Sequence, residues 1–221
     1  MNNFDGKRAI PFSPPDITQE EIDEVVDTLQ SGWITTGPKT KRFEKELAEF
    51  CSTSTVCCLN SATAALELAL RLLGIGPGDE VITSAYTYSA SCSPIIHVGA
   101  TPVLVDVAPE SFNIDPNAVG SAITKRTKAI IPIDIGGVPC DYDALYAVLE
   151  EKKNLYNPSN SIQRAFDRVI VVSDSAHAIG ATYKGKKAGQ LADFTTFSLV
   201  VLKNRTRKEY TGISEKSSKA A

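Results

Sequence analysis

An acid and a histidine, Asp174 and His177, stand three positions apart directly behind the apolar run RVIVVS (168–173). A carboxylate at the end of a buried strand needs a positive partner or several hydrogen-bond donors, because burying it alone is costly. A protonated pyridine nitrogen would be such a partner. His177 could bond a phenolic oxygen on the same ring or be a satisfied interior histidine. The other histidine, His97, lies in an apolar segment and is interpreted as structural.

A polar turn at Asn60, Ser61, Ala62 and Thr63 leads into the helical pattern ALELAL (65–70). Backbone N–H groups at a helix N-terminus, together with the helix macrodipole, favour a bound phosphate. The simpler interpretation is a plain N-cap, which is common for these residue types. The glycine-bearing stretch GIGPGDE (74–80) follows a helix and precedes a strand, which is the wrong order for a dinucleotide-binding fingerprint.

Two tyrosines and a lysine could complete a site for a flat ring. Tyr86 and Tyr88 follow the run EVITS (80–84), where an aromatic ring can stack on a cofactor or simply pack. Lys203 comes shortly after the strand-like segment DFTTFS (193–198). A lysine there could form a Schiff base if its pKa were lowered, or it could begin a solvated tail.

Short apolar runs alternate with helical patterns along the chain, which predicts an α/β fold with a mostly parallel sheet covered by helices on both faces. We expect strands at 56–59 (VCCL), 80–84, 101–107, 129–133, 168–174 and 193–198. We expect helices at 18–31, 39–50, 62–73, 89–98, from Asp115 and Pro116 onward, and at 142–152. In such sheets ligands bind at the carboxyl ends of the strands, where Asp174, Tyr88 and Thr63 would lie.

The first helix is marked by a capping box, Thr18 with Glu21. Its apolar residues recur at helical spacing and form one face: Ile22, Val25, Val26 and Leu29. The segment KNLYNPSNSIQ (153–163) is interpreted as a surface loop.

Composition narrows the class of protein. The chain has 221 residues, 43% of them hydrophobic, and a net charge of −3 without a basic stripe, so nucleic acid and anionic membrane are poor partners. The sequence has neither a membrane-span pattern nor a signal-peptide core, so we expect a cytoplasmic protein. The five cysteines lack a CxxC pair and indicate reduced, mostly buried thiols rather than disulfides or a metal site: Cys51, Cys57, Cys58, Cys92 and Cys140.

Taken together, these residues resemble the DegT/StrS-type sugar-nucleotide aminotransferases, which are pyridoxal-phosphate enzymes with the aspartate-aminotransferase-like fold. The resemblance extends from about residue 10 to residue 198. The matching stretches occur in the family's order: SGWITTGP (31–38), NSATAALELAL (60–70), GPGDEVITSAYTYSAS (76–91), GATPVLVDV (99–107), FNIDP (112–116), TKAIIPIDIGGVPCD (127–141), SDSAHAIGATYKGKKAG (173–189) and DFTTFS (193–198).

The resemblance implies a role for each candidate residue. Ser61, Ala62, Thr63 and Ser198 would hold the phosphate of pyridoxal 5'-phosphate. Tyr88 would stack on its ring, Asp174 would pair with the ring nitrogen and keep it protonated, and His177 would lie near the phenolic oxygen. Lys203, five residues after Ser198, would form the Schiff base and act as general acid and base. The implied partners are an amino-acid donor (glutamate or glutamine), a nucleotide-linked keto-sugar and a second subunit in a homodimer.

The sequence departs from the family after residue 198. The glycine-rich segment that usually follows the lysine and the small C-terminal domain have no counterpart here, so the resemblance implies a large domain truncated after it. We expect three regions: an N-terminal helix and active-site connector (1–38), a cofactor-binding large α/β domain (39–202) and an irregular tail (203–221). Alternatives are a catalytically impaired fragment, a non-catalytic nucleotide-sugar-binding or regulatory relative, and a pyridoxal-phosphate-dependent sugar dehydratase.

Overall fold

The structure, a computed structural model, describes residues 16–199 and contains a five-stranded parallel sheet. The strand order is β2-β1-β3-β4-β7, so β2 and β7 are the edge strands. The strand bounds are β1 Glu80–Ser84, β2 Thr101–Val105, β3 Thr127–Ile131, β4 Ile170–Asp174 and β7 Phe194–Thr196. A small antiparallel hairpin, β5 Thr182–Tyr183 with β6 Lys186–Lys187, lies outside this sheet.

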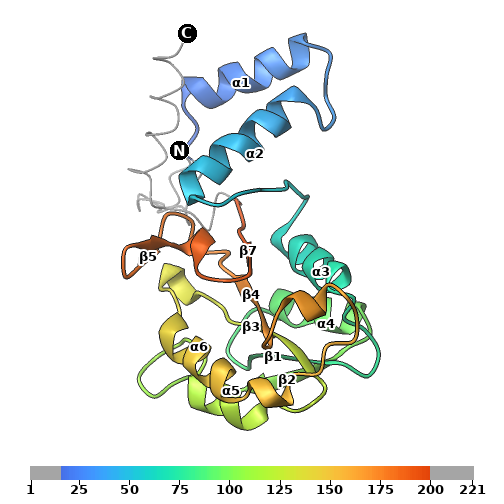
Figure 1. Cartoon of the computed structure of the whole chain (residues 1–221). Coiled ribbons are helices and arrows are strands. Elements are labelled where there is room, and N and C mark those ends of the chain that lie inside the picture. Colours follow the sequence, from blue (N-terminus) through green and yellow to red (C-terminus); the bar gives the residue numbers. More distant parts are fainter. Residues whose placement is uncertain (1–15, 200–221) are drawn as a thin grey trace, which may run out of the picture.

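Helices cover both faces of the sheet, as predicted (Figure 1). The α-helices are α1 Gln19–Gln30, α2 Pro38–Cys51, α3 Ala62–Leu72, α4 Ser93–His97, α5 Pro116–Ala122 and α6 Tyr142–Glu151. Short 3-10 turns connect them: η1 Ser89–Ser91, η2 Ile135–Gly137, η3 Lys153–Leu155, η4 Gln163–Ala165 and η5 Ala188–Gln190. Figure 1 shows α1 and α2 extending from the layered body as a pair.

The nearly continuous apolar strands arise because successive side chains of a strand enter opposite layers. In β4, Val171 belongs to the core under α5 and α6, whereas Val172 belongs to the core under α3 and α4. The same alternation places Ile130 in the first core and Ile131 in the second. Continuing the alternation, Asp174 faces the α3 side and Ser173 faces the α6 side.

Most local signals in the sequence are confirmed. Thr18 and Glu21 form the expected capping box at the start of α1. Asp115 caps α5 by accepting a hydrogen bond from the N–H of Asn117, and Pro116 occupies the first turn. The strand expected at 129–133 covers 127–131 instead: β3 ends at Ile131, directly before Pro132, because proline lacks the N–H that a ladder needs.

The predicted strand at 56–59 is wrong. This stretch is extended but belongs to no strand, because no neighbouring strand bonds to its backbone within the described residues. The helix predicted at 89–98 is two short pieces, η1 and α4, with the break at Cys92. Pro94 explains the break, since proline favours the first turn of a new helix over the interior of a longer one.

The expectation of mostly buried cysteines needs correction, and the apolar face of α1 is exposed: none of the residues of α1 is buried, and Leu29 is 64% exposed. The five cysteines are free thiols, as expected, but only Cys51 and Cys140 are buried, while Cys57 is exposed.

The segment 153–163, expected as a surface loop, contains η3 and the first residue of η4 with an irregular stretch between them, and its side chains are anchored. Asn160 and Gln163 both donate to the backbone oxygen of Leu73, and Gln163 is fully buried. None of the helices within residues 16–199 is both long and apolar enough to cross a membrane.

Candidate active site

The carboxyl end of β4 carries a buried acid with few partners. Asp174 is 7% exposed, and its Oδ2 accepts a hydrogen bond from the hydroxyl of Ser91 at 2.7 Å. Its Oδ1 accepts from the backbone N–H of Ala176 at 3.2 Å. Thr87 extends the chain of hydroxyls, with its Oγ1 2.8 Å from that of Ser91. No cationic side chain pairs with Asp174 in the part of the chain that the structure describes.

The N-terminus of α3 lies at the same edge of the sheet, because the helix runs back to the amino end of β1. Ser61 is the N-cap, and its Oγ accepts from the N–H of Ala64 at 3.1 Å. The plain cap interpretation is therefore confirmed for the side chain of Ser61. The N–H groups of Ala62 and Thr63 have no recorded partner among residues 16–199, so they remain available to an anion.

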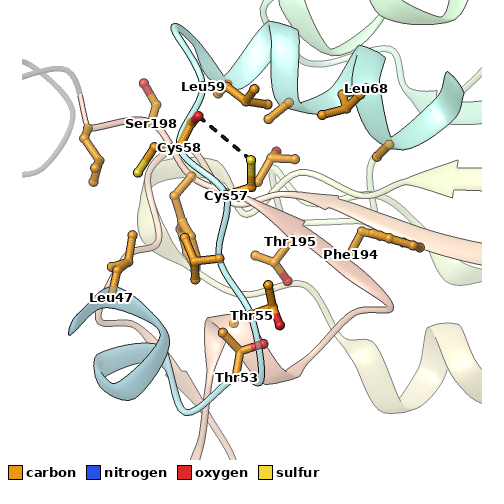
Figure 2. Close-up of a pocket in the computed structure, with 18 of the residues that line it drawn as sticks. Leu47, Thr53, Thr55, Cys57, Cys58, Leu59, Leu68, Phe194, Thr195 and Ser198 are labelled. Carbon is orange, nitrogen blue, oxygen red and sulfur yellow. Dashed lines mark hydrogen bonds between the residues drawn. The ribbon is translucent and has the colours of Figure 1, made fainter. Parts of the chain in front are cut away.

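A cavity of about 940 Å³ opens beside this helix end. Ser61 and Ala62 line it. Ser198, which follows β7 and is labelled in Figure 2, lines it as well. Three of the four residues expected to hold a phosphate thus share one cavity; Thr63 lies next to them and is half-buried. Tyr88, Asp174 and His177 are not among its lining residues.

Tyr88 and His177 are exposed at the edge of the sheet. Tyr88 is the N-cap of η1, the turn that also carries Ser91, and it is 76% exposed. The Nδ1 of His177 accepts a hydrogen bond from the N–H of Gly136 at 3.3 Å. This contact ties the turn after β4 to the turn after β3, with the second ring nitrogen left for another partner.

The opposite face of β4 holds a second buried acid. Asp134 is fully buried and accepts from the hydroxyl of Ser175 at 2.6 Å, the N–H of Cys140 at 2.9 Å and the hydroxyl of Tyr142 at 3.1 Å. Burial raises the pKa of Asp134 despite these donors. Burial also raises the pKa of the Cys140 thiol. This network joins the ends of β3 and β4 to α6.

The sequence interpretation missed Ser91, although it lies three residues after Tyr88, the spacing that brings a side chain of a helical turn back to the same side. His97 bonds Glu67 on the surface, its Nδ1 2.9 Å from a carboxylate oxygen, which agrees with a structural role. Lys203, the candidate Schiff-base residue, lies outside the described residues.

The residues present fit pyridoxal phosphate. Among the described residues, a buried carboxylate without a cationic partner suits a protonated ring nitrogen, and N–H groups without a partner at a helix start suit a phosphate. Both stand at the carboxyl edge of a parallel sheet, on the α3 side. The fold and these residues define a class, the large domain of the pyridoxal-phosphate-dependent aminotransferases of the aspartate-aminotransferase-like fold.

Comparison with known proteins gives the particular family. Residues 15–209 match the DegT/DnrJ/EryC1/StrS aminotransferase family, and the chain belongs to it. This family uses pyridoxal phosphate. The chain is 45% identical over 195 residues to the spore coat polysaccharide biosynthesis protein SpsC of Bacillus subtilis, covering 88% of this chain and 46% of that protein.

Comparison with solved structures agrees with this family assignment. The putative sugar aminotransferase Spr1654 of Streptococcus pneumoniae, in its pyridoxamine-phosphate form, superposes with a TM-score of 0.87 at 58% identity. That match covers 88% of this chain and 49% of the other, and the same protein is known in a pyridoxal-phosphate form. DesI, solved in the presence of its TDP-sugar product, gives a TM-score of 0.73 at 30% identity, over 86% of this chain and 45% of DesI. This chain therefore spans about half the length of its relatives.

Proposed function

We propose that this chain supplies the cofactor-binding part of an aminotransferase that moves an amino group from glutamate or glutamine to a nucleotide-linked keto-sugar. The observation that carries the proposal is the buried carboxylate of Asp174 at the carboxyl edge of the sheet, which pairs with no cationic side chain among residues 16–199. The TDP-sugar product of DesI and the polysaccharide role of SpsC support a nucleotide-linked sugar.

Each residue would have a separate task. The N–H groups of Ala62 and Thr63, with the hydroxyls of Ser61 and Ser198, would bind the phosphate. Asp174 would hold a proton on the ring nitrogen, so that the bound cofactor supplies an electron sink. The ring of Tyr88 would cover one face of the cofactor and exclude water.

His177 and Lys203 would complete the site. His177, positioned by the N–H of Gly136, would orient the ring through its phenolic oxygen. Lys203 would hold the cofactor covalently and then move a proton at the substrate carbon as general base and acid. The homodimer and the cytoplasmic location expected from the sequence stay predictions.

The test is cofactor binding by the purified chain with Asp174→Asn and Asp106→Asn as a matched pair. Asp106 directly follows β2, much as Asp174 ends β4, but its side chain is exposed and accepts a hydrogen bond from the N–H of Val107, the one contact it makes among residues 16–199. We expect the wild-type chain and Asp106→Asn to bind pyridoxal phosphate, seen by its absorbance, and borohydride to attach the cofactor to Lys203. Asp174→Asn should bind at least tenfold more weakly, on the order of 1.4 kcal/mol.

Equal binding by Asp174→Asn would remove the proposed role of this carboxylate. Cofactor attached to a lysine other than Lys203 would remove the proposed role of Lys203. Amino transfer is then followed with glutamate or glutamine and a nucleotide-linked keto-sugar. Binding without transfer would favour the non-catalytic relative.

A further inference from the structure

Asp134, the buried acid shortly after β3, bonds both turns that carry the candidate ring-binding residues. It is fully buried, and its backbone N–H donates to the oxygen of Asp174 at 3.1 Å. Its backbone oxygen accepts from the N–H of Gly137 at 3.2 Å. Its carboxylate accepts from the hydroxyl of Ser175 at 2.6 Å. This one residue therefore connects the turn after β3 to the turn after β4.

Ser175 is the residue through which Asp134 holds the turn after β4. Its hydroxyl bonds the Asp134 carboxylate, and its backbone N–H donates to a β7 oxygen at 2.9 Å. Its backbone oxygen accepts from the N–H of Ala178 at 2.9 Å. Asp174 directly precedes Ser175, and His177 lies inside the turn that the Ala178 bond closes. The three bonds of Ser175 thus fix the backbone beside both candidate residues.

The turn after β3 contacts His177 from the other side. The N–H of Gly136 donates to the Nδ1 of His177 at 3.3 Å. A Cβ at Gly137 would lie 2.8 Å from the backbone oxygen of His177, so the two turns are in close contact. Gly137 is itself bonded to the oxygen of Asp134, so the position of His177 depends on this acid through both turns.

Stability alone does not explain an acid at this position. Replacing buried hydrogen-bonded groups by apolar groups of the same shape is often nearly neutral for stability. The carboxylate here is bonded instead by the hydroxyls of Ser175 and Tyr142 and by the N–H of Cys140. A buried network whose members are bonded in this way makes the local structure rigid and unique. Such rigidity matters at an active site, where a displacement of about 1 Å can slow a reaction about 100-fold.

We propose that Asp134 is a positioning residue for the cofactor ring. By bonding Ser175 and the turn after β3, it holds the carboxylate of Asp174 and the imidazole of His177 at the separation that the ring nitrogen and the phenolic oxygen require. Asp134 acts through these two residues, because it lies on the opposite face of β4 from Asp174. The inference rests on the proposed function of Asp174 and His177 and adds the residue that fixes their geometry.

The first test is a matched pair of variants without cofactor. Ser175→Ala and Tyr142→Phe each remove a hydroxyl that bonds the Asp134 carboxylate. Among the described residues, the Tyr142 hydroxyl has no recorded bond to the turn that carries His177. The chain has two histidines, so its NMR spectrum contains two imidazole signals, which His97→Gln assigns. We expect Ser175→Ala to shift the His177 signal, Tyr142→Phe to leave it in place, and the His97 signal to stay unchanged in both.

The second test adds the cofactor. Pyridoxal phosphate should bind Ser175→Ala at least about tenfold more weakly than the wild type, and Tyr142→Phe within about threefold of it. The NMR shift of an isotope-labelled ring nitrogen reports whether that nitrogen keeps its proton. The wild type and Tyr142→Phe should give the protonated ring. In Ser175→Ala the signal should move toward the unprotonated position, because Asp174 no longer faces the nitrogen, and a loss of stability alone would not move it.

A second pair of variants tests Asp134 itself. Asp134→Asn keeps groups that can bond Ser175, so it should bind the cofactor within about threefold of the wild type. Asp134→Leu has a similar volume but no such group, so it should shift the His177 signal and bind the cofactor at least about tenfold more weakly. Ser175→Cys has a side chain of similar size with a much weaker donor, and it replaces Ser175→Ala or Asp134→Leu should either not fold.

A wild-type His177 signal or wild-type cofactor affinity in Ser175→Ala would overturn the proposal. A shifted His177 signal with an unchanged ring-nitrogen signal would leave Asp134 a purely structural role and overturn it as well. Failure of the proposed function looks different: the wild-type chain does not bind pyridoxal phosphate, or Asp174→Asn binds it equally well. The inference then falls together with the proposed function.

Discussion

The acid at the end of β4 depends on a single side-chain donor among its recorded contacts. The hydroxyl of Ser91 bonds Asp174 at 2.7 Å, and the other recorded contact is the N–H of Ala176. A buried carboxylate that loses a donor keeps its desolvation cost without the compensation. At the scale of the residue, the hydroxyl of Ser91 thus compensates much of the desolvation cost of the Asp174 carboxylate, with or without a cofactor.

We predict that Ser91→Ala lowers the free energy of unfolding by about 1.5–3 kcal/mol, the value of a hydrogen bond to a charged group. Ser89→Ala is the control, because Ser89 lies in the same turn and is exposed. It should change the free energy of unfolding by less than about 0.5 kcal/mol. Urea unfolding measures both variants. Equal values would show that Asp174 does not depend on this hydroxyl.

Asp134 gives a prediction about pH. Burial raises its pKa above the ordinary value of 3.8, so the folded protein keeps a proton that the unfolded chain releases near pH 4. The stability that this proton supplies is complete below about pH 4 and is lost as the pH rises through the folded pKa. The Asp134→Asn variant has no carboxyl group to deprotonate at this position. Its free energy of unfolding relative to that of the wild type should therefore rise as the pH increases from 4.

Asp141→Asn is the control for that measurement. The hydroxyl of Tyr183 and the N–H of Ala144 bond Asp141 and lower its pKa, so its titration is complete below about pH 4. Its stability relative to the wild type should stay constant above that pH. Urea unfolding midpoints between pH 4 and pH 8 compare the three proteins. A relative stability of Asp134→Asn that falls with pH would contradict the raised pKa.

At the scale of the element, the turns after β3 and β4 fit against each other. Gly137 has a φ of +83°, and a Cβ there would lie 2.8 Å from the backbone oxygen of His177. Gly136 has a similar φ of +63°, but a Cβ there would meet nothing within 4 Å. Substituting each glycine by alanine therefore distinguishes the free-energy cost of a left-handed backbone, present at both positions, from the cost of close packing, present at Gly137.

We expect Gly136→Ala to cost about 1–2 kcal/mol of unfolding free energy, from backbone strain alone. Gly137→Ala should cost about 1–3 kcal/mol more, since the backbone at His177 must also move. Thermal or urea unfolding gives the difference between the two variants. Similar costs would mean that the two turns are not packed as tightly as described.

Helices and strands were predictable from the sequence where interactions between neighbouring residues determine them. The capping box of α1 and the Asp115–Pro116 start of α5 act through neighbouring atoms, so the sequence reveals them. The stretch 56–59 reads as a strand because its residues are apolar, but a strand also needs a bonded neighbour, which no local pattern records. The exposure of the apolar face of α1 could not be predicted for the same reason: amphipathic spacing reveals an apolar face but not whether another surface covers it.

The candidate site shows the same division. The position of Asp174 at the carboxyl edge of the sheet was predictable, because the sequence shows directly where an apolar strand ends. The partner of Asp174 was not, because Ser91 is 83 positions away and only the fold brings the two together. The ring of Tyr88 and the imidazole of His177 lie at the expected edge, and their proposed roles wait on cofactor binding.

At the scale of the whole molecule, the elements differ in how many bonded neighbours they have and in how many residues they bury. The strands β1, β3 and β4 each have a bonded neighbour on both sides, and their burial is complete or nearly so. Within the described range, 16–199, β7 and β2 have one bonded neighbour each. The pair α1 and α2 contributes little to the core: α1 buries no residue, and α2 buries Leu47 and Cys51 against Ile179.

These differences in pairing and burial predict the order of amide hydrogen exchange. Protection should be greatest in β1 and β3, lower in the edge strands β2 and β7, and least in α1, because local opening is easiest where few apolar contacts must break. Mass-spectrometric exchange of the wild-type chain measures each segment. The order discriminates between two explanations of the exposed α1 face. If α1 exchanges as slowly as β3, another surface covers its apolar residues in solution; if it exchanges first, the helix depends on its capping box and its own hydrogen bonds alone.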